Sequence, residues 1–330
     1  MFLMNQKIQY TSLLVLIALI VGGFTNTSAQ SYADAVEKFN DAQELLRAND
    51  LAGAKNVFQE AISISRTVGS EADELRARAE RQIPNIQFTI ARGYFSNRNF
   101  ERAITEFEQA LEYAEQYNET QIINNVRRAL PVAYLQWGNQ EFRNNNNDKA
   151  EELYRRAIEL NANYARAYYQ LGLIERRRGN TEQALELYDQ AILIARNLGD
   201  TEVENLAETA ARDFLTFLGA TATENGRYRQ AIEYLERSLE YDMQFADTFY
   251  RLAEAQNNLA LWDEAVRSAE QALRFERGGQ VARAKIHFEL GIAHMNRGQE
   301  ARACESFRNA SFGAFRAAAE HHIEHELNCR

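Results

Sequence analysis

Residues 165–172 read ARAYYQLG, residues 179–180 read GN, and Ala184, Tyr188 and Ala191 follow. Spacings of four and three residues place the last three on one face of a helix. Gly179 and Asn180 predict a turn between that helix and the one before it. Gly172 stands twelve residues before Ala184, so small residues on both helices allow a close approach of the two backbones. The large Tyr188 then fills the space beside this contact.

This pattern recurs along the chain. Its second half reads Ala54-Phe58-Ala61, Ala103-Phe107-Ala110, Ala150-Tyr154-Ala157, Ala184-Tyr188-Ala191, Ala231-Leu235-Ser238, Ala265-Ala269-Ala272 and Ala303-Phe307-Ala310. The small residues of the first half are Ala42, Ala91, Gly138, Gly172, Gly219, Ala253 and Gly291. A single hairpin cannot bury both of its faces, so neighbouring hairpins must stack.

With these residues the chain resembles the tetratricopeptide repeat family over nearly all of residues 32–317. The resemblance implies an all-α fold, a right-handed α-solenoid of about seven helical hairpins with a polar capping helix at 317–328. The expected repeats span about 35–68, 84–117, 131–164, 165–198, 212–245, 246–279 and 284–317. The helix-terminating Pro of the family is absent, and position 162 is Ala.

The repeats are unevenly spaced. Successive first alanines lie 49, 47, 34, 47, 34 and 38 residues apart, against a family period of about 34. Three insertions at 62–83, 111–130 and 192–211 account for the excess, and each predicts a longer second helix, a Gly or Asn stop and a new helix capped at Ser70, Asn118 or Asp200. Pro84 and Pro131 either start a helix or kink a long one. Because no Ser-, Gly- or Pro-rich linker occurs, we expect one continuous array over 30–330.

The first 29 residues have the features of a signal peptide. A polar start with Lys7 precedes an apolar run from Ser12 to Phe24, which is shorter than the roughly 20 residues of a membrane span. Thr27-Ser28-Ala29 predicts cleavage before Gln30. We expect an exported protein, periplasmic or secreted, with no membrane span after signal removal; an uncleaved anchor is the alternative.

Charge restricts the class of partner. The chain after residue 29 has 36 Lys and Arg against 47 Asp and Glu, which argues against nucleic acid, since its binding depends on neutralised phosphates. Residues 121–180 are the exception, with ten basic against six acidic residues. A cationic segment favours an acidic partner. The alternative is that these arginines are ordinary solvated charges on outer faces.

The resemblance implies that the first helix of each repeat lines a concave groove for another protein or peptide. Repeat position then selects Phe39, Gln43, Phe88, Arg92, Phe95, Asn139, Phe142, Arg143, Arg166, Tyr169, Arg176, Arg177, Tyr250, Glu254, Asn257, Phe288 and Met295. Aromatic and Arg side chains are typical of interface hot spots. The alternative is that the aromatic rings pack between repeats.

The C-terminus carries the one motif typical of an enzyme, H-x-x-E-H from His321 to His325. A zinc protease needs a third ligand downstream, and only five residues remain. We therefore expect no catalytic residue, no cofactor and no metal site, with His321 and His325 as weak candidates for metal binding. Cys304 and Cys329 are expected to form a disulfide, or else to stay free thiols.

Three functions are compatible with these patterns. The leading one is a non-enzymatic scaffold or adaptor of the bacterial cell envelope that binds an extended or helical segment. The second is a structural repeat protein that self-assembles into homo-oligomers. The third is a metal-binding protein that uses the His-rich end.

Overall fold

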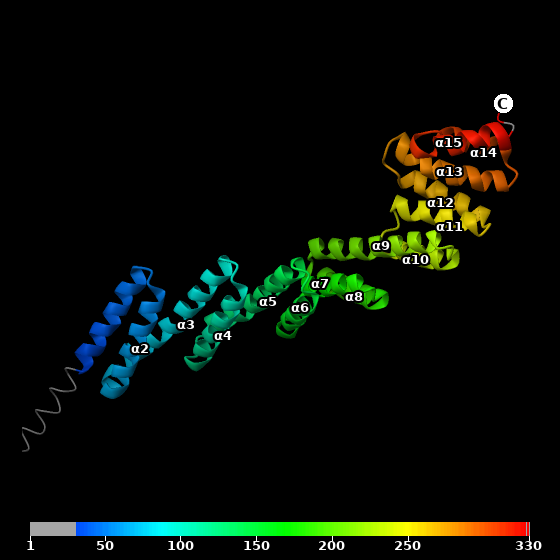
Figure 1. Cartoon of the computed structure of the whole chain (residues 1–330). Coiled ribbons are helices and arrows are strands. Elements are labelled where there is room, and N and C mark those ends of the chain that lie inside the picture. The colour runs from blue at the N-terminus through cyan, green and yellow to red at the C-terminus, as the bar shows by residue number, and fades with distance from the viewer. Residues whose placement is uncertain (1–30, 328, 330) are drawn as a thin grey trace, which may run out of the picture. The chain divides into compact units, whose positions relative to one another are not determined.

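The computed structural model describes residues 31–327 and 329, and the described part is all-α (Figure 1). The expected signal peptide and its cleavage site before Gln30 lie outside these residues. Residues 31–47 form the first described helix. The others are α2 (Leu51–Val68), α3 (Asp73–Ser96), α4 (Phe100–Gln116), α5 (Thr120–Arg143), α6 (Asn147–Leu160), α7 (Ala165–Arg178), α8 (Thr181–Leu198), α9 (Thr201–Glu224), α10 (Tyr228–Tyr241), α11 (Ala246–Asn258), α12 (Trp262–Phe275), α13 (Gln280–Asn296), α14 (Glu300–Ala310) and α15 (Arg316–His321). Among the residues described, no helix combines the length and apolarity needed to cross a bilayer.

The helices pack as sequential hairpins, as the repeat pattern predicts. Close backbone approach explains the small residues: a Cβ at Gly172 would lie 2.5 Å from Cε1 of Tyr188, and a Cβ at Gly219 would lie 2.4 Å from Cγ of Leu235. Aromatic pairs nineteen residues apart fill the space beside these contacts in several hairpins, as in Phe39 with Phe58. The expected trio of small, large and small residues therefore forms the core of the hairpins, with Ala269 in place of the large residue in the sixth.

A left-handed residue closes the turn between the two helices of every hairpin. The positive φ angles belong to Asn49, Arg98, Asn145, Gly179, Gly226, Ala260 and Gly298, all at the same repeat position. Glycine adopts this conformation without cost, whereas a Cβ strains it by about 1–2 kcal/mol. Ala260, with φ of 60°, is the least suited of these residues because alanine lacks the polar side chain that lets Asn compensate locally.

We expect Ala260→Gly to stabilise the fold by about 0.5–1 kcal/mol, because the strain relieved exceeds the extra freedom of the unfolded chain. Urea unfolding measures the change. As a control of opposite sign, Ala301→Gly in the exposed face of α14 should cost about 1 kcal/mol. A loss of stability in Ala260→Gly would contradict the inferred strain of the left-handed conformation at this residue.

The three insertions lengthen the helices on both sides of a sharp corner. The second helices α2, α4 and α8 have 18, 17 and 18 residues, and the helices that follow have 24 each. Gly69, Asn118 and Gly199 stop the second helices with positive φ, as expected. Asp200 caps α9 by accepting a hydrogen bond from the Val203 N–H. The predicted caps at Ser70 and Asn118 are wrong, because neither side chain caps a helix and Asn118 itself takes the left-handed turn.

The two prolines lie inside long helices rather than at their starts. Pro84 is within α3 and Pro131 within α5, and both are buried. A proline inside a helix leaves the carbonyl four residues earlier without its donor. The insertions place eleven helical residues, about three turns, before each proline. Apolar residues such as Leu75 and Val126 bury these extensions against the preceding second helix.

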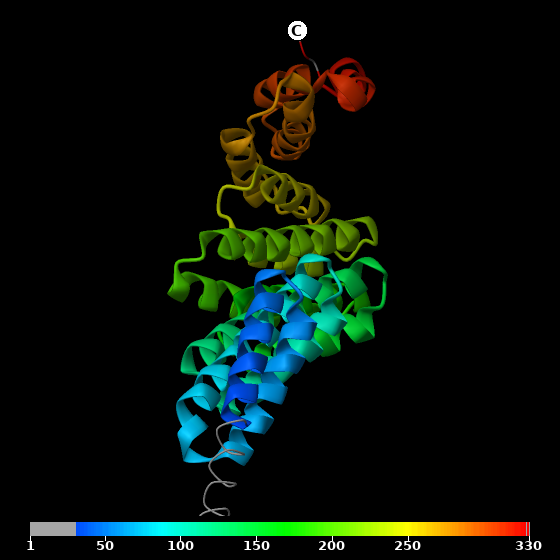
Figure 2. The ribbon, with the colours of Figure 1, turned by 90° about the vertical axis from the view of Figure 1, so that its left-hand side faces the viewer.

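The contacts divide the chain into two compact units, residues 1–162 and 163–330, here called unit 1 and unit 2. The continuous array over 30–330 stays a prediction, and the boundary between the units follows the third hairpin. Within unit 1 the first helices α3 and α5 contact each other, and within unit 2 α7 contacts α9, α9 contacts α11, and α11 contacts α13. The first helices thus contact one another along each unit, and each also packs on the second helix of its own hairpin. Figure 2 shows the same helical ribbon from the side.

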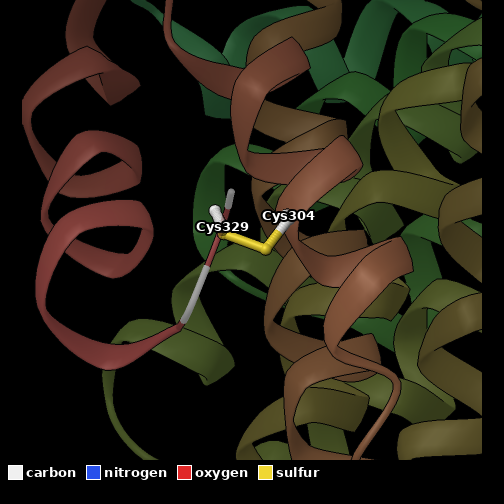
Figure 3. The surroundings of a disulfide bond; sticks show 2 residues. All are labelled: Cys304 and Cys329. Carbon is white, nitrogen blue, oxygen red and sulfur yellow. A yellow bond between two sulfur atoms is a disulfide. The ribbon is translucent and has the colours of Figure 1, made fainter.

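The C-terminal cap is shorter than expected. The helix continues from α15 through wider turns over His322–Glu326, and Leu327 is extended, so the predicted helix to 328 ends too late. Ala319, Ile323 and Leu327 pack on the apolar end of the last hairpin. The extended tail returns Cys329 to Cys304 on α14, and the two form a disulfide with Cα atoms 5.5 Å apart (Figure 3).

We expect Cys304→Ala/Cys329→Ala to lower the stability of unit 2 by about 2–4 kcal/mol, since the bond closes a loop that the unfolded chain would otherwise open. Reductant should lower the midpoint of urea unfolding in the parent protein by a similar amount and leave the double variant unchanged. Two alkylatable thiols in the untreated protein would contradict the bond.

Candidate protein-binding surface

The first helices of unit 1 have one side that no other helix among the described residues of the unit covers. Successive helical residues are about 100° apart, so repeat positions 2, 6, 9 and 13 fall within roughly 60° of one another, where position 1 is the first residue of each repeat. On α3 these positions are Asn85, Thr89, Arg92 and Ser96, and all four are exposed. Positions 5 and 12 point instead toward the neighbouring first helix and are buried or half-buried in most repeats.

In unit 1 this side forms a surface that we call the unit 1 face. It comprises Val36, Asn40, Gln43, Arg47, Asn85, Thr89, Arg92, Ser96, Val132, Gln136, Asn139 and Arg143. Five of these residues are Asn or Gln, three are Arg, and none is acidic. Residues 31–162 as a whole hold 16 Lys and Arg against 21 Asp and Glu. The unit 1 face therefore has the opposite charge to the unit that carries it.

The polar groups of this face are largely unengaged. Within the described residues, Arg47, Arg92 and Arg143 make no ion pair. Asn139 Oδ1 accepts a hydrogen bond from the hydroxyl of Tyr154 at 2.9 Å, which fixes the amide and leaves its N–H groups to donate outward. A ligand would therefore not have to break an existing ion pair to reach these arginines.

The same positions in unit 2 differ in charge and pairing. Acidic residues stand among the basic ones, and Lys285 pairs with Asp247 at 2.5 Å across α11 and α13. Arg251 pairs with Glu254 at 3.2 Å on α11. Phe217 on α9 is the large apolar side chain exposed here, at 60%. This side of unit 2 is thus neutralised internally.

The residues selected from the sequence divide between these two situations. Arg92, Asn139 and Arg143 lie on the unit 1 face, at positions 9 and 13. Phe88 is half-buried with its ring centroid 5.5 Å from that of Phe107, and Phe142 is half-buried as well. Phe88, at position 5, therefore follows the alternative interpretation and packs between helices.

In unit 2 the selected residues are engaged within the fold. Tyr250 is only 6% exposed, so its assignment to an open groove is wrong; burial also raises the pKa of its phenol. Tyr169 packs against Tyr188 with ring centroids 6.1 Å apart. Arg166 pairs with Glu202 at 2.8 Å, and the guanidinium of Arg176 lies 5.3 Å from the ring centroid of Phe214. Arg177 is exposed and has a partner within the fold.

The other weak candidates behave as structural residues. Cys329 is bonded to Cys304 and has no thiolate to offer a metal beside His321 and His325. In the described part of the chain no group of three His, Cys, Asp or Glu is arranged to hold a metal ion. His294 is buried and its Nδ1 lies 2.8 Å from Gln299 Oε1, as expected of a satisfied core histidine. His287 differs, because its buried Nδ1 has no partner.

In unit 1, sequence reasoning missed the residues at positions 2 and 6. Asn85, Thr89 and Gln136 are examples, and they share the exposed side with positions 9 and 13. The helical angle alone would have found them. The aromatic residues that interface composition favours instead pack in the core of this chain, as Phe88 and Tyr169 do.

Comparison with known proteins agrees with this architecture. Sequence models described as tetratricopeptide repeat match residues 84–117, 130–197, 163–244 and 222–287, together more than half of the chain. The chain belongs to the tetratricopeptide repeat family. Proteins of this family are scaffolds that bind proteins or peptides and are generally not enzymes. No curated protein matches the chain.

Several solved structures share the tetratricopeptide repeat architecture. YrrB, described as a tetratricopeptide repeat protein with an unusual peptide-binding site, is 17% identical over 65% of this chain and 97% of its own, with a TM-score of 0.37. MamA from Desulfovibrio magneticus RS-1 is 15% identical over 59% and 97%, with a TM-score of 0.37. PilW, a type IV pilus biogenesis factor, is 19% identical over 72% and 99%, with a TM-score of 0.32.

Proposed function

We propose that this tetratricopeptide repeat protein is exported to the bacterial cell envelope and holds a segment of another protein on the unit 1 face. The observation that carries the proposal is the state of that face. Its residues are exposed or half-buried, none is acidic, and its three arginines have no ion pair among the described residues. The corresponding side of unit 2 is instead neutralised by its own charges.

Export is supported by the sequence of residues 1–29 and by the disulfide. A short apolar run followed by Thr27-Ser28-Ala29 is typical of a cleaved signal. A disulfide such as Cys304–Cys329 persists in oxidising compartments outside the cytosol. Fractionation of the native cells with N-terminal sequencing tests this part: we expect a mature chain that begins at Gln30, and a full-length cytosolic chain would refute export.

The binding role is tested by capture from the native envelope. Mature protein and the variant Arg47→Gln/Arg92→Gln/Arg143→Gln are each crosslinked to envelope extract, and the linked segments are identified by mass spectrometry. We expect adducts on helix 31–47, α3 and α5 of the parent protein and their loss in the variant. A matched control, Arg66→Gln/Arg127→Gln/Arg155→Gln, removes the same charge from other exposed surfaces of unit 1 and should retain the adducts. Equal capture by all three proteins would refute the assignment.

A further inference from the structure

Resting on the proposed function, we infer the chemistry of the partner segment: the unit 1 face binds an extended polypeptide that carries carboxylates, about six to eight residues long. The inference concerns the selectivity of the face for its ligand. It rests on the charge of the face, on the absence of ion pairs at its arginines and on the arrangement of its amides.

The charge of the unit 1 face favours an acidic segment over a basic one. A carboxylate approaching the unit 1 face meets Arg47, Arg92 and Arg143 and no acidic residue of the face. Each guanidinium can bind a carboxylate through two parallel N–H donors. Because these arginines have no ion pair in the described structure, their full charge is available to the ligand. A basic segment would face uncompensated repulsion at the same positions.

The amides favour an extended backbone. A side chain of Asn or Gln offers both a donor and an acceptor, which is what the N–H and C=O of an unpaired peptide group require. Such side chains stand on all three first helices, as Asn40, Asn85 and Gln136 show. A helical segment satisfies its own backbone groups and would offer these amides only its side chains.

The length of the segment follows from the width of the layer. Helix 31–47 packs against α3, and α3 contacts α5. Packed helices lie about 8–10 Å apart, so the three axes span roughly 20 Å. An extended chain advances about 3.3 Å per residue and covers this width in six residues, with one more at either end.

The test measures the binding of fluorescent ten-residue peptides with blocked ends to the mature full chain, by fluorescence anisotropy at low ionic strength. The first peptide alternates Glu and Ser; the second has Gln for Glu, the third Lys for Glu, and the fourth carries N-methyl groups at alternate backbone nitrogens of the first. We expect the Glu peptide to bind at least tenfold more tightly than each of the others, and added salt to weaken it.

Variants of the chain test whether the preference for the Glu peptide arises from the unit 1 face. Arg47→Gln/Arg92→Gln/Arg143→Gln should bind the Glu and Gln peptides alike, and Thr89→Glu should weaken the Glu peptide at least tenfold. The control Arg66→Gln/Arg127→Gln/Arg155→Gln should keep the preference of the parent. Circular dichroism shows that each variant is folded, and Thr89→Glu keeps the test decisive if the triple variant is not.

Each other outcome overturns the inference. Equal binding of the Glu and Gln peptides would contradict recognition of the carboxylates. Equal binding of the N-methylated peptide would contradict recognition of an extended backbone. Absence of binding by every peptide at 1 mM would contradict binding of such a segment by the unit 1 face. A preference for the Glu peptide that survives in the triple arginine variant would show that the preference does not come from this face. If envelope segments still crosslink to α3 and α5 in these cases, the proposed function stands and only the partner chemistry is wrong.

Discussion

Phe107→Ala is expected to destabilise unit 1 by about 3–5 kcal/mol while unit 2 keeps its stability. The Phe107 side chain is 2% exposed and packs among Ala91, Ala110 and Ala133. These alanines are too small to fill the cavity that truncation leaves. Since a domain is stable by only about 5–15 kcal/mol in total, the loss is a large fraction of the stability of the unit.

The chain contains a separate reporter for each unit. Its two tryptophans are Trp137 on α5 and Trp262 on α12, so urea unfolding is followed in Trp262→Phe and Trp137→Phe backgrounds. We expect Phe107→Ala to move the transition seen by Trp137 alone. The mirror variant Phe307→Ala, fully buried in unit 2, should move the transition seen by Trp262 alone. A common shift of both transitions would show that the two units unfold as one.

The contribution of Glu289 to the stability of unit 2 should fall as pH rises toward 7, by roughly 3 kcal/mol. Burial between α11 and α13 raises the pKa of Glu289 to about 7 from the ordinary 4.5. The Asn257 amide donates a hydrogen bond to the carboxylate at 2.8 Å and lowers this pKa in part. Glu254 raises this pKa further and Arg251 lowers it. The folded state thus binds the proton more tightly than the unfolded state. The stabilisation is complete below pH 4.5 and is lost as pH rises through the folded pKa.

Glu289→Gln isolates this effect because it keeps the shape of the protonated side chain. We expect the variant to exceed the parent in stability at pH 8 and to match it near pH 4.5, as measured by urea unfolding with Trp262 as the probe. His287 and His294 have lowered pKa values, chiefly through burial, and act in the opposite direction as pH falls. They are common to both proteins and cancel in the difference. Parallel pH profiles would contradict a proton on Glu289.

The sequence predicted the hairpins well, because their core depends on contacts within each repeat. The pairing of Gly172 with Tyr188 or Gly291 with Phe307 fixes the distance between two adjacent helices whatever the rest of the chain does. The stops at Gly69 and Gly199 were equally local, since a positive φ is required where a helix ends. The longer helices around the insertions follow from these stops.

The candidate surface was predicted less well, because exposure depends on the neighbouring repeat. Tyr250 and Arg176 stand at repeat positions that an isolated hairpin would leave open, and the next first helix covers or engages them. The buried pair of Asn257 and Glu289 joins residues 32 positions apart, and no local pattern announces it.

Site-specific photo-crosslinking in the native cells tests the central claim most directly. A photoreactive amino acid replaces Thr89 in the middle of the unit 1 face, or Glu112 on the exposed side of the second helix α4 as a matched control. If the unit 1 face holds a partner segment, irradiation yields a discrete adduct from position 89 that the replacement of Arg47, Arg92 and Arg143 by Gln abolishes, and none from position 112. An adduct from position 112 alone, or one from position 89 that survives the loss of the arginines, would contradict the account.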